Sequence, residues 1–153
     1  MTTSEEADST TTGLSEVVHA HGHEHVSAAH KSTFEVTTDD WLTPAGDCIL
    51  AIEADHAPAS FAPAFREACQ DSGATITATI EVDEYVETVT GCGHPELTFG
   101  SERSLVCRTS THVDDRTVMV ETDAAAADFD RDLVAALADG ADLTLRLTVE
   151  PSG

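Results

Sequence analysis

Five of the eight histidines lie in one short stretch, from His19 to His30. His19, His21, His23 and His25 alternate with other residues, so in an extended strand their side chains point to the same face. Neutral imidazoles on one face are good ligands for zinc, nickel, copper or iron. The spacing therefore predicts a divalent transition metal at His21 and His23. The alternative is a histidine cluster on the surface that binds nothing.

A second group of polar residues follows the histidines and offers acid and base chemistry. Thr33 and Glu35 share one face of a predicted strand, whereas His30 faces the opposite way unless a bulge intervenes. Asp47 follows a turn further along the chain. Glu35 and Asp47 are the candidate catalytic carboxylates, and His30 and Thr33 are candidate ligand-binding residues. The alternative gives Thr33 and Glu35 a solvated face and His30 one buried hydrogen bond.

Three of only six arginines, Arg103, Arg108 and Arg116, lie close together in a strongly acidic chain. Guanidinium groups bind phosphate and carboxylate through paired hydrogen bonds. Arg108 shares a strand face with Ser110, and Arg116 lies in the turn that follows. Arg108, Ser110 and Arg116 are therefore predicted to hold a small anionic ligand. The alternative is that these arginines form salt bridges with the neighbouring acidic residues, Glu102, Asp114 and Asp115.

The segment Gly91-Cys92-Gly93-His94-Pro95 has the composition of a tight loop. Its glycines allow the backbone to approach a ligand closely, so Gly93 is a further candidate binding residue. An ordinary turn also explains the two glycines. The segment is not a P-loop, because the terminal Gly-Lys-Ser/Thr is missing.

Composition narrows the class of protein and its setting. The chain has 153 residues and carries 29 acidic residues against seven basic ones, a formal net charge of −22. Such self-repulsion is tolerated where salt screens it, which predicts a salt-rich cytoplasm. The charge argues against binding to nucleic acid and to anionic membranes. There is no signal-peptide pattern and no long apolar span, and the four separated cysteines are expected to be free thiols. The oligomeric state is left undefined.

The pattern of apolar residues predicts one domain and its fold. Residues 1–16 are expected to form a disordered acidic extension, and residues 17–150 a single β-rich domain. Alternation is clear at 75–82 and 143–149, and apolar stripes with helical spacing occur within 55–72 and 123–139. No internal repeat is evident. The expected fold is mainly β, an antiparallel sandwich or a barrel-like, jelly-roll-like domain with two short helices. Further strands are expected at 17–18, 26–38, 48–52, 85–89, 97–99, 105–110 and 117–122.

Several separate segments, in order, resemble an archaeal family known as domain of unknown function 371. The similarity covers roughly residues 17–150 and suggests a haloarchaeal member. It implies a compact β-sandwich-like domain in an archaeal cytoplasm, and it implies no activity. The segments that carry it are Ala20–His23, Ala29–Thr37, Leu42–Ile49, Gly91–Pro95 with Leu97–Thr98, Arg108–Ser110 and Asp115–Val120.

These residues lead to three functional hypotheses. The preferred one is a β-sandwich that binds a small anionic metabolite or a metal, in a pocket where residues 21–48 meet the 91–94 loop and residues 108–116. The second is a metal-assisted hydrolase in which Glu35 or Asp47 acts as the base. The third is a structural or interaction module without a site. All three depend on whether segments distant in sequence meet in space.

Overall fold

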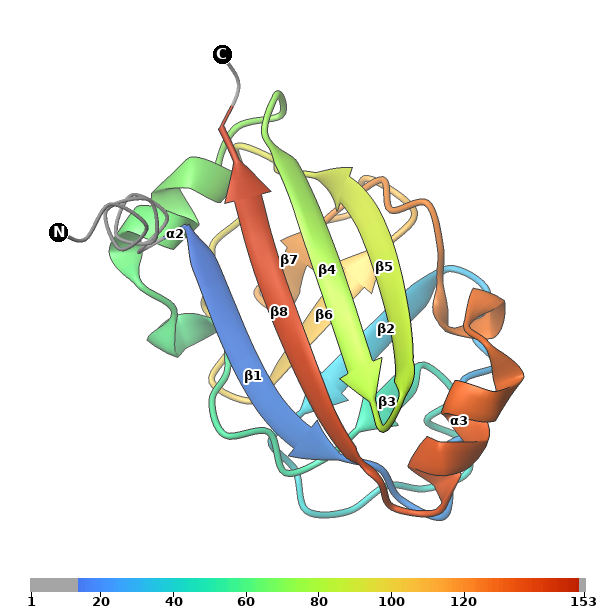
Figure 1. Ribbon diagram of the computed structural model, residues 1–153. Helices are drawn as coiled ribbons and strands as arrows, with labels where there is room; N and C mark the ends of the chain where they lie inside the picture. The colour runs from blue at the N-terminus through green and yellow to red at the C-terminus, as the bar shows by residue number, and fades with distance from the viewer. Residues whose placement is uncertain (1–13, 152–153) are drawn as a thin grey trace, which may run out of the picture.

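The computed structural model describes residues 14–151 and shows two β-sheets packed face to face, with a short helix at each of two opposite ends (Figure 1). The four helical segments come in two pairs, each a single 3-10 turn followed by an α-helix. The elements are, in chain order, β1 (Ser15–His21), β2 (Thr33–Thr37), β3 (Ile49–Ala51), η1 (Pro58–Ser60), α2 (Pro63–Cys69), β4 (Thr75–Val82), β5 (Tyr85–Cys92), β6 (Ser104–Arg108), β7 (Thr117–Met119), η2 (Ala126–Asp128), α3 (Arg131–Ala138) and β8 (Asp142–Glu150).

The two sheets have four strands each. Sheet A has the order β1-β8-β4-β5 and is antiparallel throughout. Sheet B has the order β3-β2-β6-β7, with an antiparallel central pair and a parallel strand at each edge. In Figure 1, sheet A faces the viewer and sheet B lies behind it. The prediction of a mainly β, sandwich-like fold with two short helices is confirmed.

The core lies between the sheets because both supply alternating apolar side chains. In β4, Ile76, Ala78 and Ile80 point inward and are buried, whereas the intervening threonines are not. In β2, Phe34 and Val36 fill the space from the opposite side. Each α-helix closes one end of the sandwich with an apolar stripe, as period-3.6 spacing predicts. The residues of these stripes are Phe65 and Cys69 in α2 and Leu133, Val134 and Leu137 in α3.

Some predicted boundaries differ from the structure. β1 ends at His21, so the prediction of one strand face carrying His19 through His25 is wrong, and His23 and His25 lie in the turn that follows. The predicted strand at 97–99 is irregular backbone, with Phe99 at a φ of 53°. At the N-terminus, β1 already includes Ser15 and Glu16. Residues 1–13 of the predicted disordered extension lie outside the described residues.

No repeat is evident in the sequence, but the second half of the chain repeats the order of elements of the first. Residues 15–82 and 85–150 each run strand, strand, strand, 3-10 turn, α-helix, strand. β1 corresponds to β5, β2 to β6, β3 to β7, α2 to α3 and β4 to β8. Each sheet order is then symmetric about its centre, with the axis between β4 and β8 in sheet A and between β2 and β6 in sheet B. A pseudo-two-fold axis therefore runs through both sheets.

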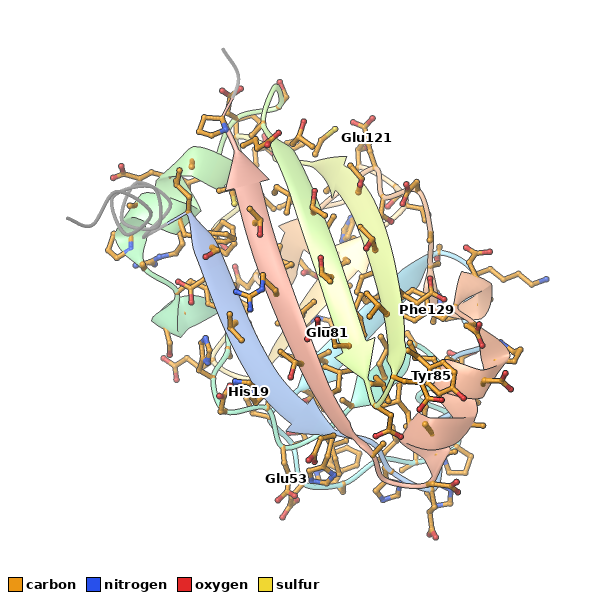
Figure 2. All side chains as sticks on the ribbon, in the orientation of Figure 1. His19, Glu53, Glu81, Tyr85, Glu121 and Phe129 are labelled. Carbon is orange, nitrogen blue, oxygen red and sulfur yellow. The ribbon has the colours of Figure 1, made fainter. Side chains whose placement is uncertain are left out.

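Hydrogen bonds follow this symmetry. The Ala62 N–H donates to Glu16 Oε2 at 2.7 Å, and the Asp130 N–H donates to Glu87 Oε2 at 2.7 Å. Glu53 and Glu121 have φ of 54° and 53°, a left-handed conformation uncommon for residues with a side chain. Figure 2 shows these two glutamates at opposite ends of the molecule, as a two-fold rotation requires. The strand registers agree, since Glu35 pairs with Val106 and Thr79 with Arg146 on the axis itself.

Two glycines mark the same place in each half. A Cβ on Gly22 would lie 1.8 Å from the Leu137 carbonyl oxygen at the end of α3, and a Cβ on Gly93 would lie 2.1 Å from the Cys69 carbonyl oxygen at the end of α2. Only glycine allows a strand to pass so close to a helix terminus. The Gly22 N–H donates to Ala141 O, and the Gly93 N–H donates to Ala74 O. Both glycines are thus required by packing.

Candidate functional site

The outer face of sheet B carries most of the buried polar side chains. Glu35 is only 9% exposed, and Thr37, Ser104 and Thr117 are almost fully buried. These residues lie on β2, β6 and β7, on the side opposite to Phe34 and Val36. Burial of polar groups costs free energy unless they have partners. A polar layer on one sheet face is therefore the first place to look for a site.

A pocket of about 270 Å³ opens on this face. Its lining residues come from strands β2, β3 and β6, from residues 39–48, and from the two arginines that flank β6 and β7. Its charged groups balance in number, two carboxylates against two guanidinium groups. The residues that line it are Glu35, Asp39, Trp41, Gly46, Cys48, Ile49, Arg103, Ser104 and Arg116.

Glu35 lies at the centre of a continuous chain of contacts. The Cys48 thiol donates to Glu35 Oε1 at 3.3 Å, and Arg116 Nη1 lies 3.7 Å from Glu35 Oε2. The Thr33 hydroxyl hydrogen-bonds Cys48 and also contacts His30 Nδ1 at 3.1 Å. The structure therefore links four of the candidate residues, His30, Thr33, Glu35 and Arg116, through one series of contacts. It adds Cys48 as the link between Thr33 and Glu35.

The chain continues from Arg116 to Arg108 through Asp114. Asp114 Oδ2 accepts from Arg116 Nη2 at 3.4 Å and from Arg108 Nη2 at 2.9 Å. Arg108 Nε donates to Thr117 Oγ1 at 2.9 Å, and its side chain is only 13% exposed. Burial works against the charge of Asp114, but the backbone N–H of Arg116 and the charge of Arg108 lower the Asp114 pKa to about 2. Arg108 is thus held by partners within the protein.

Cys48 is a neutral thiol. Burial, together with the charge of Glu35 and the hydrogen bond to it, raises the pKa of Cys48 to about 12. The reactive form of cysteine is the thiolate, so Cys48 is a poor nucleophile and serves as a hydrogen-bond donor. All four cysteines are free thiols in this structure.

The two exposed arginines of the pocket are held differently. Arg103 donates from Nε and Nη2 to the carboxylate of Asp39 at 2.7–3.0 Å, and its guanidinium lies 5.9 Å from the centre of the Trp41 ring. Among the described residues, the Arg116 guanidinium contacts carboxylates at 3.4 and 3.7 Å, both longer than the 2.7–2.9 Å usual between charged partners. With 46% of its side chain exposed, Arg116 keeps donors available to a ligand.

Asp47 and Ser110 lie beside this chain of contacts. The Asp47 backbone carbonyl accepts from the N–H groups of Ala29 and His30, and its carboxylate contributes to the raised pKa of Cys48. Ser110 Oγ accepts from the His112 N–H at 3.3 Å. Among residues 14–151, the hydrogen bonds and ion pairs found do not link either side chain directly to Glu35 or Arg116.

The predicted metal residues and Gly93 belong to other parts of the molecule. His21 Nε2 lies 2.6 Å from Glu53 Oε1, and His23 Nδ1 accepts from the His25 N–H at 3.0 Å. Gly93 lies against the end of α2. In the described part of the chain, histidine, cysteine and carboxylate side chains do not gather in threes as a metal site requires.

Sequence reasoning missed several of the residues that form the pocket. Asp39 and Ser104 carry no motif, and their role appears only when the register of β2 and β6 is known. Trp41 gave a usable signal, since it is the only tryptophan and follows two aspartates in a polar loop. It is 54% exposed at the pocket, which is unusual for so large an apolar side chain.

Comparison with known proteins identifies the family. A family model described as "Domain of unknown function (DUF371)" matches residues 18–150. The chain is also 35% identical over 133 residues to an uncharacterized protein of Methanocaldococcus jannaschii, MJ0206, covering 87% of this chain and 98% of the relative. Between residues 14 and 151, no helix has the length and apolar character needed to cross a membrane. The chain belongs to the DUF371 family, which confirms the predicted resemblance.

Proposed function

We propose that the protein binds a small organic anion, a carboxylate or a phosphate ester, in the pocket on the outer face of sheet B. The observation that carries this proposal is the incomplete pairing of Arg116 at the mouth of a pocket that also contains a buried glutamate. A guanidinium with available donors favours planar, bidentate partners such as carboxylate and phosphate. Binding of such a group satisfies donors that Asp114 and Glu35 meet only at long range.

The other predicted anion-binding arginine has a supporting role in this proposal. Arg108 is already paired with Asp114 and Thr117. It lowers the charge that Asp114 presents to Arg116, which leaves more of the Arg116 guanidinium for the ligand. Arg116 is the residue proposed to hold the anionic group. Cys48 donates to Glu35 beside it, and Thr33 hydrogen-bonds Cys48.

Simple binding is favoured over metal-assisted hydrolysis. Glu35 is the one predicted catalytic carboxylate in the pocket, and its nearest partners are a neutral thiol and a guanidinium. Over the residues that the structure describes, histidine, cysteine and carboxylate side chains do not gather in threes around Glu35, which favours simple binding.

The test measures binding of a panel of carboxylates and phosphate esters to the full chain by calorimetry. Trp41 gives a second signal, because it is the only tryptophan and lines the pocket. Titrations are run at low ionic strength and in molar potassium chloride, since salt screens the net charge of −22. We expect at least one member to bind and to quench or shift the Trp41 fluorescence.

The matched variants are R116A and R146A. Both remove one exposed arginine, but Arg146 lies on β8 in sheet A. Loss of a charge-assisted pair predicts about tenfold or more weaker binding for R116A. R146A is expected to bind as the unmodified chain does. Equal binding by R116A and the unmodified chain, or no binding by any member of the panel, contradicts the proposal.

A further inference from the structure

The two halves of the chain differ at one set of equivalent positions on the outer face of sheet B. The register that pairs Glu35 with Val106 also pairs Thr37 with Ser104 and Thr33 with Arg108, so Thr37 and Arg108 are equivalent. The Ile49 N–H donates to Gly46 O at 3.2 Å, and the Thr117 N–H donates to Asp114 O at 3.1 Å. Gly46 and Ile49 thus correspond to Asp114 and Thr117.

In the second half, these positions form a filled site. The Arg108 guanidinium lies between the Asp114 carboxylate and the Thr117 hydroxyl, with both hydrogen bonds at 2.9 Å. In the first half, a short threonine replaces the arginine, and a glycine and an isoleucine replace its two partners. Gly46 and Ile49 both line the pocket. The pocket therefore lies where the second half places a guanidinium group of its own.

A carboxylate remains available at this place. Glu35 is nine-tenths buried and lines the pocket, whereas its equivalent, Val106, is apolar. The Cys48 thiol donates to Oε1 of Glu35, while Arg116 stays 3.7 Å from Oε2. Oε2 can therefore accept a hydrogen bond from a ligand.

The other charges of the pocket suit a ligand that carries both signs. Arg103 is neutralised by its bidentate pairing with Asp39. Arg116 and Glu35 then provide one positive and one negative group on the same pocket. A zwitterionic ligand matches them without leaving an unpaired buried charge, which is costly.

We propose that the pocket binds the planar cationic group of a small guanidino or amidino acid, at the place equivalent to the Arg108 guanidinium, with Glu35 as its acceptor. This inference rests on the proposed function for the anionic end of the ligand, which Arg116 holds. It adds the cationic end and so names the ligand class. Trp41 covers the rim from a loop that is longer than its counterpart between Arg108 and Thr117.

The test uses three matched probes: guanidinobutyrate, which carries both groups; butyrate, which carries only the carboxylate; and butylguanidine, which carries only the cation. Binding to the full chain is followed by calorimetry and by Trp41 fluorescence. We expect guanidinobutyrate to bind about tenfold or more tightly than either single-group probe. E35Q is expected to reduce its affinity to that of butyrate, and R116A to that of butylguanidine. R146A, on the opposite sheet, should change neither.

A second variant, T37R, supplies the missing arginine from the protein itself. If T37R folds, its guanidinium should occupy the pocket and abolish butylguanidine binding. If T37R does not fold, E35Q still decides the question, because it keeps the size of the side chain.

The outcomes separate the two proposals. Butyrate binding as tightly as guanidinobutyrate, with R116A still weakening both, overturns the cationic end and leaves the proposed anion site standing. A different result overturns the anion site and keeps the cationic one. In that case butylguanidine binds in a way that depends on Glu35, and R116A has no effect on the affinity for guanidinobutyrate. Failure of all three probes to bind overturns the cationic end, and the panel of carboxylates and phosphate esters then decides the anion site.

Discussion

The outer face of sheet B presents two related regions, one on either side of the pseudo-two-fold axis. Around Arg108, an ion pair with Asp114 and a hydrogen bond to Thr117 fill the surface. Around Glu35, the equivalent positions hold smaller or apolar residues, and a pocket remains. The backbone hydrogen bonds of the two regions are equivalent, so the difference lies in a few side chains. One region therefore stabilises the fold, and the other is available for a ligand.

The largest expected effect tests whether the two halves of the core contribute equally to the free energy of unfolding. Phe61 and Phe129 follow the 3-10 turns at equivalent positions, and both are almost fully buried. Each of F61A and F129A should lower the free energy of unfolding by about 4 kcal/mol, through lost burial and the cavity left behind. Denaturant unfolding measures both. A large difference between them means that the repeat does not extend to core energetics.

The next effect separates the two outer regions. R108A removes a mostly buried guanidinium and leaves Asp114 without its closest charge partner, which should cost about 2 kcal/mol. T37V, at the equivalent position, removes only a hydroxyl that accepts from the Asp39 N–H, which should cost about 1 kcal/mol. The same unfolding measurement compares them.

Asp114 adds a pH signature to that comparison. Its pKa in the folded protein is about 2, below the ordinary value of 3.8. A carboxylate whose pKa is lowered by folding stabilises the folded protein at pH values above its pKa in the unfolded chain. This contribution to the free energy of unfolding is lost as pH falls from about 4 to about 2. D114N should flatten stability in this range relative to the unmodified chain. An unchanged acid slope means that Asp114 is not paired in solution.

The sequence predicted the strands correctly where apolar and polar residues alternate along the chain. The alternation in residues 75–82 matches β4, and the alternation in residues 143–149 lies within β8, because each strand has one buried face. Thr33 and Glu35 are expected on one strand face because they are two residues apart, whereas His30 is expected on the opposite face unless a bulge intervenes. The position of Arg116 beside Glu35 could not be predicted, since it depends on β2 pairing with β6 and β6 with β7.

The repeat was invisible in the sequence for a related reason. Contacts are preserved between the two halves better than residue identities are. His21 corresponds to Cys92, and both make an isolated bridge to the equivalent residues Ile52 and Val120. Identical pairs such as Gly22 and Gly93 are too scattered to be noticed by eye. Gly93 is a candidate binding residue from sequence alone, whereas the structure shows that packing against a helix end requires both glycines.

The smallest expected effect concerns the equivalent positions His21 and Cys92. The side-chain hydrogen bond to Glu53 and the Gly22 carbonyl raise the pKa of His21 above its ordinary 6.5. A raised histidine pKa stabilises the fold below pH 6.5, and the contribution is lost as pH rises through the folded value. In the second half, Glu121 has Cys92 in place of a histidine and so lacks this partner. An NMR titration should show a His21 pKa above that of a free histidine, and E53Q should lower it, whereas E121Q should not. Because the pair is partly exposed, its effect on overall stability should be near the limit of detection. A His21 pKa that is insensitive to E53Q would instead mean that the imidazole is available to a ligand, which would reopen the prediction of a metal at His21.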